Sequence, residues 1–168
     1  MRGVSLNARC VEVLSAEVDD RSMAAAQQPA PVPSWLVALQ EKLGASLIGV
    51  VLFGSQARGD ARPGSDTDIL VVVGREVQLR RSMYTWWDER FPPDLSPHFV
   101  HLPVDVDEAG VLWLEASIDG ILLHDASRRV ASLLARIRRA AVEGRLVRRT
   151  AHGHPYWVRT RTEDTHAQ

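Results

Sequence analysis

The chain has 168 residues, of which 45% are hydrophobic and 24% charged, and its formal net charge at pH 7 is -1. This length and composition suit one globular domain with a real core and exclude two large domains. A single cysteine, Cys10, excludes an internal disulfide framework, and no apolar run approaches the ~20 residues of a membrane span. We therefore expect a soluble cytoplasmic protein without a membrane partner.

Residues 1–33 mix acids, alanines and glutamines and end in a segment with three prolines, which favour extended, unpaired backbone. We expect this segment to be a flexible N-terminal leader that precedes a single domain over 34–168. Ser34 is placed to cap a helix whose apolar residues recur on one face, and Gly44 is placed to end it. The first predicted element of the domain is therefore a helix over 35–43.

Two short apolar runs rich in β-branched residues, Leu47–Phe53 and Thr67–Val73, have the composition of strands buried on both faces. Between them lie a Gly-Ser pair, a segment that can form a short helix over Gln56–Asp60, and a Pro-Gly turn. The predicted order is strand, Gly-Ser turn, short helix, loop and strand.

The next part of the chain alternates between helical and strand-like patterns, which predict a helix within 75–90, a strand over 98–104 bounded by Pro97 and Pro103, and a helix over 109–117. After a short apolar run at 121–123, Ser127 is predicted to cap a long helix that ends near Glu143. Its buried stripe is expected to contain Val130, Leu133, Leu134, Ile137 and Val142.

The run from His152 to Trp157 is interpreted as a packed aromatic turn that closes the domain. Taken together, these elements predict an α+β domain with a small mixed β-sheet flanked by helices.

The Gly-Ser turn and a nearby pair of aspartates predict a site for a metal-bound nucleoside triphosphate. Gly54 lets the backbone turn sharply and approach a ligand, and Ser55 adds a hydroxyl donor at the start of a helix, where free N–H groups favour phosphate. Asp66 and Asp68 are two residues apart, so both carboxylates emerge on one face of an extended backbone. Carboxylates that face a phosphate-binding turn suit magnesium, which keeps substrate phosphates among its oxygen ligands.

Arg58 and Arg62 lie in the connection between the turn and the aspartates, where they could offset charge on a leaving pyrophosphate. The alternative is an ordinary strand-to-helix turn in which Asp66 and Asp68 cap a loop. The complete order, with a strand, Gly-Ser, ten residues, Asp-x-Asp and a second strand, favours the functional interpretation.

The segment GSQARGDARPGSDTDILVVV, residues 54–73, closely resembles the signature of the nucleotidyltransferase fold of DNA polymerase beta-like enzymes, and within it the minimal nucleotidyltransferases of prokaryotes. That resemblance implies transfer of a nucleoside monophosphate, commonly AMP from ATP, to a hydroxyl, with two Mg²⁺ ions. Asp66 and Asp68 would hold the metals, and Gly54 and Ser55 the triphosphate. It also implies a helical HEPN-type toxin as partner, with this chain as the antitoxin that modifies a tyrosine hydroxyl on the toxin.

The family usually supplies a third carboxylate from a later strand, and by position His98 matches that acid. A histidine can act as a general base near neutral pH or bind a metal other than magnesium. A shifted strand register could instead bring in Asp105 as the third acid. His98 and His101 could also be half-buried strand histidines whose hydrogen bonds neighbours satisfy.

Residues 128–161 contain ten arginines and one acidic residue, so this region attracts polyanions such as RNA, although a nucleic-acid partner is not favoured over a protein partner. Two other functions stay open. The first is a non-catalytic nucleotidyltransferase-fold module that masks a partner, and the second is an enzyme that nucleotidylates an antibiotic hydroxyl.

Overall fold

The computed structural model describes residues 32–152 and 154–160. Contacts divide the chain into two units, residues 1–33 and 34–168, and the fold given below is that of the second unit. The predicted leader, apart from its last two residues, lies outside the described residues.

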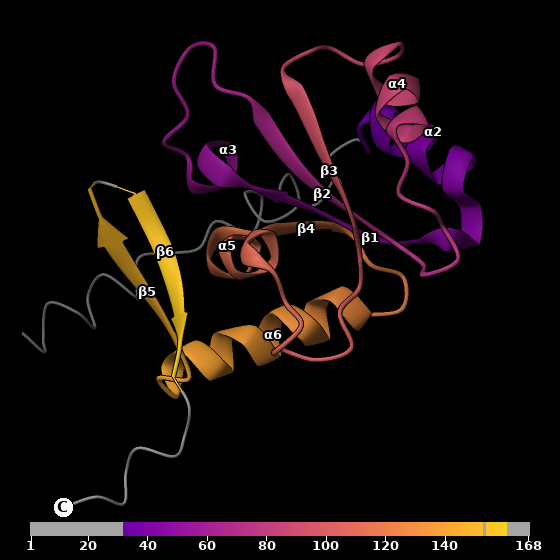
Figure 1. Cartoon of the computed structure of the whole chain (residues 1–168). Helices are drawn as coiled ribbons and strands as arrows, with labels where there is room; N and C mark the ends of the chain where they lie inside the picture. The colour runs from indigo at the N-terminus through magenta and orange to yellow at the C-terminus, as the bar shows by residue number, and fades with distance from the viewer. Residues whose placement is uncertain (1–31, 153, 161–168) are drawn as a thin grey trace, which may run out of the picture. The chain divides into compact units, whose positions relative to one another are not determined.

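A four-stranded mixed sheet forms the centre of this unit (Figure 1), and its strand order is β3-β2-β1-β4. The strands are β1 Leu47–Phe53, β2 Thr67–Val73, β3 Leu95–His101 and β4 Ile121–His124. The sequence predicted β1 and β2 with these bounds, because each is an uninterrupted apolar run. β1 is antiparallel to β2 and β4, whereas β2 and β3 are parallel.

Helices cover both faces of the sheet, and the strands alternate their side chains between two cores (Figure 1). On one face, Ile69, Val71 and Trp87 belong to a cluster shared with α2 Ser34–Leu43 and α4 Arg81–Asp88. On the other face, Leu70 and Val72 pack with α5 Val111–Asp119 and α6 Arg129–Val142. The fold is therefore a mixed α+β fold with a sheet between helical layers, as the sequence predicted.

The short elements at the ends of β1 set the position of the candidate site. A 3-10 helix, η1 Gly44–Ser46, leads into β1, and the five-residue helix α3 Gly54–Arg58 follows its last residue directly. Gly59 ends α3 in the left-handed region with a φ of 76°. The short helix thus begins two residues earlier than predicted, with the Gly-Ser pair as its first turn.

The C-terminal part contains a second sheet that the sequence analysis missed. β5 Leu146–Ala151 and β6 His154–Arg159 pair as an antiparallel hairpin. The predicted aromatic turn over 152–157 is wrong, because most of that segment is strand β6. Trp157 packs against the core that α5 and α6 share and donates a 2.7 Å hydrogen bond from Nε1 to Glu115.

Two predictions about α6 are also wrong. Ser127 does not cap the helix, because Arg128 precedes it in the left-handed region (φ 57°) and the carboxylate of Asp125 accepts a 2.8 Å hydrogen bond from the amide of Ala131. Val142 is 89% exposed, because the buried stripe that runs through Ile137 continues at Ala140 instead.

The predicted helix within 75–90 is confined to α4, and the segment before it consists of turns and irregular backbone. None of the helices in the described part of the chain has the length and apolar character needed to cross a membrane.

Candidate nucleotide and metal site

The antiparallel pairing of β1 and β2 brings the Gly-Ser turn against the second aspartate. Phe53, the last residue of β1, pairs with Asp68 in β2, so Gly54 lies directly beside the aspartate side chain. A Cβ atom added to Gly54 would lie 2.5 Å from Asp68 Oδ2, closer than any real contact allows. Gly54 also has a φ of 77°, which side chains rarely adopt. Only glycine therefore allows both the left-handed backbone conformation at position 54 and the close approach of the Asp68 carboxylate.

The first turn of α3 presents backbone N–H groups beside that carboxylate. No side chain caps the helix start at Phe53, so the turn can donate these groups to a ligand. Ser55 is partly buried, and its carbonyl oxygen accepts a 3.1 Å hydrogen bond from the amide of Asp60, which closes the short helix. The first turn of α3 can therefore bind an anion such as a phosphate, and a cation can lie between that anion and the carboxylate of Asp68.

Asp66 and Asp68 both lie at the N-terminal end of β2, with Asp66 exposed and Asp68 half-buried. Their oxygen atoms are the ligands that Mg²⁺ prefers, and Mg²⁺ in nucleotide sites is usually held by one or two carboxylates together with substrate phosphates. Within 32–152 and 154–160, no group of three or more His, Cys, Asp or Glu side chains is arranged to hold a metal ion. The donor set therefore fits Mg²⁺ only when phosphate oxygens complete its coordination.

His98, which the sequence analysis matched to the third acid, lies next to Asp68. Its Nε2 atom is 3.2 Å from Asp68 Oδ1, and each side chain is 33% exposed. The imidazole also packs on Phe53, with 5.4 Å between ring centroids. Phe53 was not predicted as part of the site, although its place immediately before the Gly-Ser turn was a usable signal. If Nε2 carries the proton and donates to Asp68, Nδ1 is left as a proton acceptor.

Asp105 does not reach this site, so the alternative in which it supplies the third acid is wrong. β3 runs parallel to β2 and places Ser96 opposite Asp68, whereas Asp105 follows the far end of β3. Its Oδ1 atom accepts hydrogen bonds from the amides of Asp107 (2.9 Å) and Glu108 (3.0 Å). Asp105 therefore stabilises a local turn at the opposite end of the sheet.

His101 is a strand histidine with a structural hydrogen bond, which is the alternative that the sequence analysis gave for it. Its Nε2 atom lies 2.8 Å from the carbonyl oxygen of Val77, at the end of β3 away from Asp68.

The two arginines of the connecting segment, Arg58 and Arg62, are exposed. In the described part of the chain, neither side chain makes a hydrogen bond or ion pair with Asp66 or Asp68. Arg58 donates a 3.2 Å hydrogen bond to Asp60, a partner that the sequence analysis did not consider although the two residues are only two apart. The backbone amide of Arg62 donates to Ser65 Oγ at 2.9 Å. Both guanidinium groups can turn toward a bound phosphate, since an exposed pair such as Arg58–Asp60 is weak.

Residues 36–107 match the family model described as a nucleotidyltransferase domain. The match contains β1, β2, β3 and each residue placed in the candidate site. Comparison with curated proteins found no match.

Solved structures that match this chain include a toxin–antitoxin complex with AMP-PNP, which is 18% identical with a TM-score of 0.47, over 66% of this chain and 86% of that chain. Another is the MntA–HepT toxin–antitoxin pair, which is 16% identical with a TM-score of 0.44, over 66% and 85% of the two chains. A third is the complex of a tri-AMPylated Shewanella oneidensis HEPN toxin with its MNT antitoxin, which is 17% identical with a TM-score of 0.45, over 66% and 84%.

Proposed function

Because residues 36–107 match the family model of a nucleotidyltransferase domain, we propose that this chain transfers AMP from ATP to a hydroxyl group of a partner protein. The observation that carries the proposal is the contact between Gly54 and Asp68. Gly54, which no other residue can replace without strain at the start of α3, lies against the carboxylate of Asp68, which we propose holds a metal. An ordinary strand-to-helix turn would not need that contact.

In this proposal the first turn of α3 binds the triphosphate through its backbone N–H groups and the hydroxyl of Ser55. Asp66 and Asp68 hold Mg²⁺, which when bound stabilises negative charge on the attacking and leaving oxygens. Arg58 and Arg62, at the exposed rim, offset charge on the pyrophosphate. The hydrogen bond with His98 fixes the orientation of the Asp68 carboxylate.

His98 is proposed as the group that receives the proton of the acceptor hydroxyl. With Nε2 donating to Asp68 Oδ1 at 3.2 Å, Nδ1 can accept that proton as the hydroxyl attacks the α-phosphorus. The packing of Phe53 on the imidazole limits its rotation. His98 would thus activate the acceptor hydroxyl, which is one of the two roles of the family's third carboxylate. Only two carboxylates, those of Asp66 and Asp68, would then hold the metal.

The proposed acceptor is a tyrosine on a helical HEPN-type toxin, and this chain is proposed to be its antitoxin. The sequence resemblance of residues 54–73 supports this partner. The described residues form a four-stranded sheet with its flanking helices and a two-stranded hairpin. Among these residues there is no separate domain that could bind an acceptor. An acceptor carried by another protein suits such a small domain.

A second function is favoured by the same histidine. If His98 is protonated, it forms an ion pair with Asp68 and competes with a metal for that carboxylate. The chain would then bind nucleotide or partner without transferring AMP, and would act by masking the partner.

Transfer can be tested with ATP labelled at either the α- or the γ-phosphate, incubated with Mg²⁺, the chain and its co-purified partner. AMP transfer predicts that only the α-label enters the partner, and that Asp68→Asn abolishes it. Asp60→Asn is the matched control, because it makes the same chemical change at an exposed aspartate of the same segment. Partner inhibition by wild-type chain without incorporation of label would establish the masking function instead.

A further inference from the structure

A hollow lined by arginines lies at the opposite end of the sheet from Asp68. It has a volume of about 540 Å³, and its polar lining consists of Arg75, Ser127, Arg128, Arg129, Ser132 and Arg136. We call this set the arginine hollow. Leu102 and Pro103, which follow β3, form part of its apolar wall.

The basic C-terminal region does not form one continuous arginine surface. Several of its arginines have partners inside the unit, namely Arg138 with Ser117, Arg145 with Glu143, Arg148 with Glu115, and Arg159 with Val106 and Ala109. By contrast, the guanidinium groups of Arg128, Arg129 and Arg136 make no hydrogen bond or ion pair within the described residues. The unpaired guanidinium groups of Arg128, Arg129 and Arg136 therefore gather at the hollow, whereas Arg139 and Arg149 are exposed outside it.

Helix geometry directs these side chains into one place. Arg129, Ser132 and Arg136 are three and four residues apart, so they share one exposed face of the first turns of α6. Arg75 reaches the same hollow from the segment after β2. Ser127, which does not cap α6, has its hydroxyl available on the rim.

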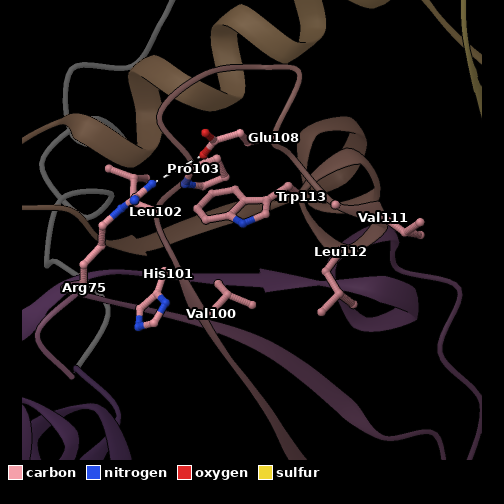
Figure 2. A pocket seen from close by; sticks show the side chains of 10 residues that line it. Arg75, Val100, His101, Leu102, Pro103, Glu108, Val111, Leu112 and Trp113 are labelled. Atoms are coloured by element: carbon pink, nitrogen blue, oxygen red, sulfur yellow. Dashed lines mark hydrogen bonds and ion pairs between the residues drawn. The ribbon is translucent and has the colours of Figure 1, made fainter. Parts of the chain in front are cut away.

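Two carboxylates lie close to the hollow and do not neutralise it. Glu108 contacts Arg75 at 3.4 Å, but the two side chains are 54% and 66% exposed, so this pair is weak. Figure 2 shows this pair at a neighbouring, mainly apolar hollow lined by Trp113 and Val100. The two hollows share Arg75, Leu102 and Pro103. Glu76 is near enough to Arg129 for attraction, but is not within ion-pair distance of it. A phosphate can replace Glu108 as the partner of Arg75.

The arginine hollow is separate from the proposed triphosphate site. Asp68 lies opposite Ser96, near the start of β3, whereas Leu102 follows the end of that strand. At about 3.3 Å per residue, the strand rises about 20 Å between Ser96 and Leu102. One ATP molecule bound at Gly54 could not place its phosphates in both.

We propose that the arginine hollow is a second anion site, which binds a small ligand carrying two or more linked phosphate groups. Arginine forks and serine hydroxyls are the donors that recognise phosphate oxygens, and four guanidinium groups exceed the charge of a single phosphate. A compact ligand is chosen over an RNA strand because four guanidinium groups gather in one hollow, whereas Arg138, Arg145 and Arg148 are engaged with other groups of the unit.

The test is calorimetric titration of the full-length chain with inorganic tripolyphosphate in the presence of EDTA, which removes metal from the Gly54 site. The double variant Arg129→Gln/Arg136→Gln should weaken binding on the order of tenfold or more, because each lost guanidinium removes charge-assisted hydrogen bonds. The control Arg139→Gln/Arg149→Gln removes the same charge at exposed positions outside the hollow. It should bind like the wild type, and circular dichroism should show all proteins folded.

Three results would overturn the proposal. The first is an absence of tripolyphosphate binding by the wild type, and the second is equal weakening in the two double variants, which would indicate general charge attraction. The third is tight binding of a short single-stranded RNA that depends on Arg129 and Arg136 while tripolyphosphate binds weakly. That outcome would identify the hollow as a nucleic-acid contact instead.

Discussion

Replacing Gly54 by alanine puts a methyl group where the carboxylate of Asp68 now lies. The added Cβ would be 2.5 Å from Asp68 Oδ2, whereas an ordinary van der Waals contact begins at 3.4 Å. The carboxylate must therefore retreat by about 0.9 Å, or α3 must shift by a similar amount. Either change alters the position of Asp68 relative to the turn.

Gly59 provides a matched control at the other end of α3. Its φ of 76° is nearly the same as the 77° of Gly54, but a Cβ added there meets no atom within 4 Å in the described part of the chain. Both alanine variants should lose about 1–2 kcal/mol of stability, which is the usual cost of a left-handed alanine. Only Gly54→Ala should also displace the aspartate, and a misplacement of about 1 Å can lower a rate by ~100-fold.

The assay compares the rate of α-label transfer from ATP to the partner for the two variants, with thermal unfolding measured alongside. We expect similar melting temperatures for Gly54→Ala and Gly59→Ala, with a ~100-fold lower rate for Gly54→Ala alone. Equal rates in the two variants would show that the contact between Gly54 and Asp68 has no part in transfer.

Three further predictions concern single residues. His98→Ala should lower the transfer rate ~100-fold or more with little change in nucleotide affinity, and full activity in this variant would exclude His98 as the base. The carboxyl group of Glu76 has a lowered pKa because it accepts hydrogen bonds from its own backbone amide and from Ser46. The ionised carboxylate therefore stabilises the folded chain above the ordinary glutamate pKa, and this stabilisation is lost as pH falls through the lowered value. Acid unfolding curves should therefore show a weaker pH dependence in this range for Glu76→Gln than for the wild type. Gly49→Ala should cost about 1–3 kcal/mol in urea unfolding, because its Cβ would lie 2.6 Å from Val130 Cγ2 in α6; an unchanged midpoint would contradict this packing.

The centre of the fold could be predicted from the sequence because its signals are local. β1 and β2 are continuous runs of apolar residues between polar turns, so their bounds follow directly from composition. Gly54 and Asp68 were predicted to share a site from their spacing, and the β1–β2 register confirms that they lie together. Their roles in binding triphosphate and metal stay predictions, as do those of Ser55, Arg58, Arg62, Asp66 and His98.

The edge of the sheet was less predictable. Pro97 was taken as a boundary, yet it lies within β3 and pairs with Ile69. An edge strand tolerates proline because only one of its sides is paired. The direction of β3 relative to β2 could not be read from the chain either, and that direction is what excludes Asp105 from the site.

The C-terminal region shows the limit of charge counting. Arg148 and Glu115 are 33 residues apart in sequence and 3.0 Å apart in the fold, so their pairing depends on the β5–β6 hairpin. Arginines also interrupt the apolar pattern of β5, which concealed the strand. The local sequence therefore could not distinguish paired arginines from those of the arginine hollow.

Gly54 and Asp68 are proposed to form a site for metal-bound triphosphate, and calorimetric titration with Mg-ATP tests this site. The wild type and Asp60→Asn should bind Mg-ATP with equal affinity, Asp68→Asn should bind it at least tenfold more weakly, and EDTA should weaken binding to the wild type. An Asp68→Asn protein that binds Mg-ATP as tightly as the wild type would show that Asp68 does not hold the metal-bound triphosphate.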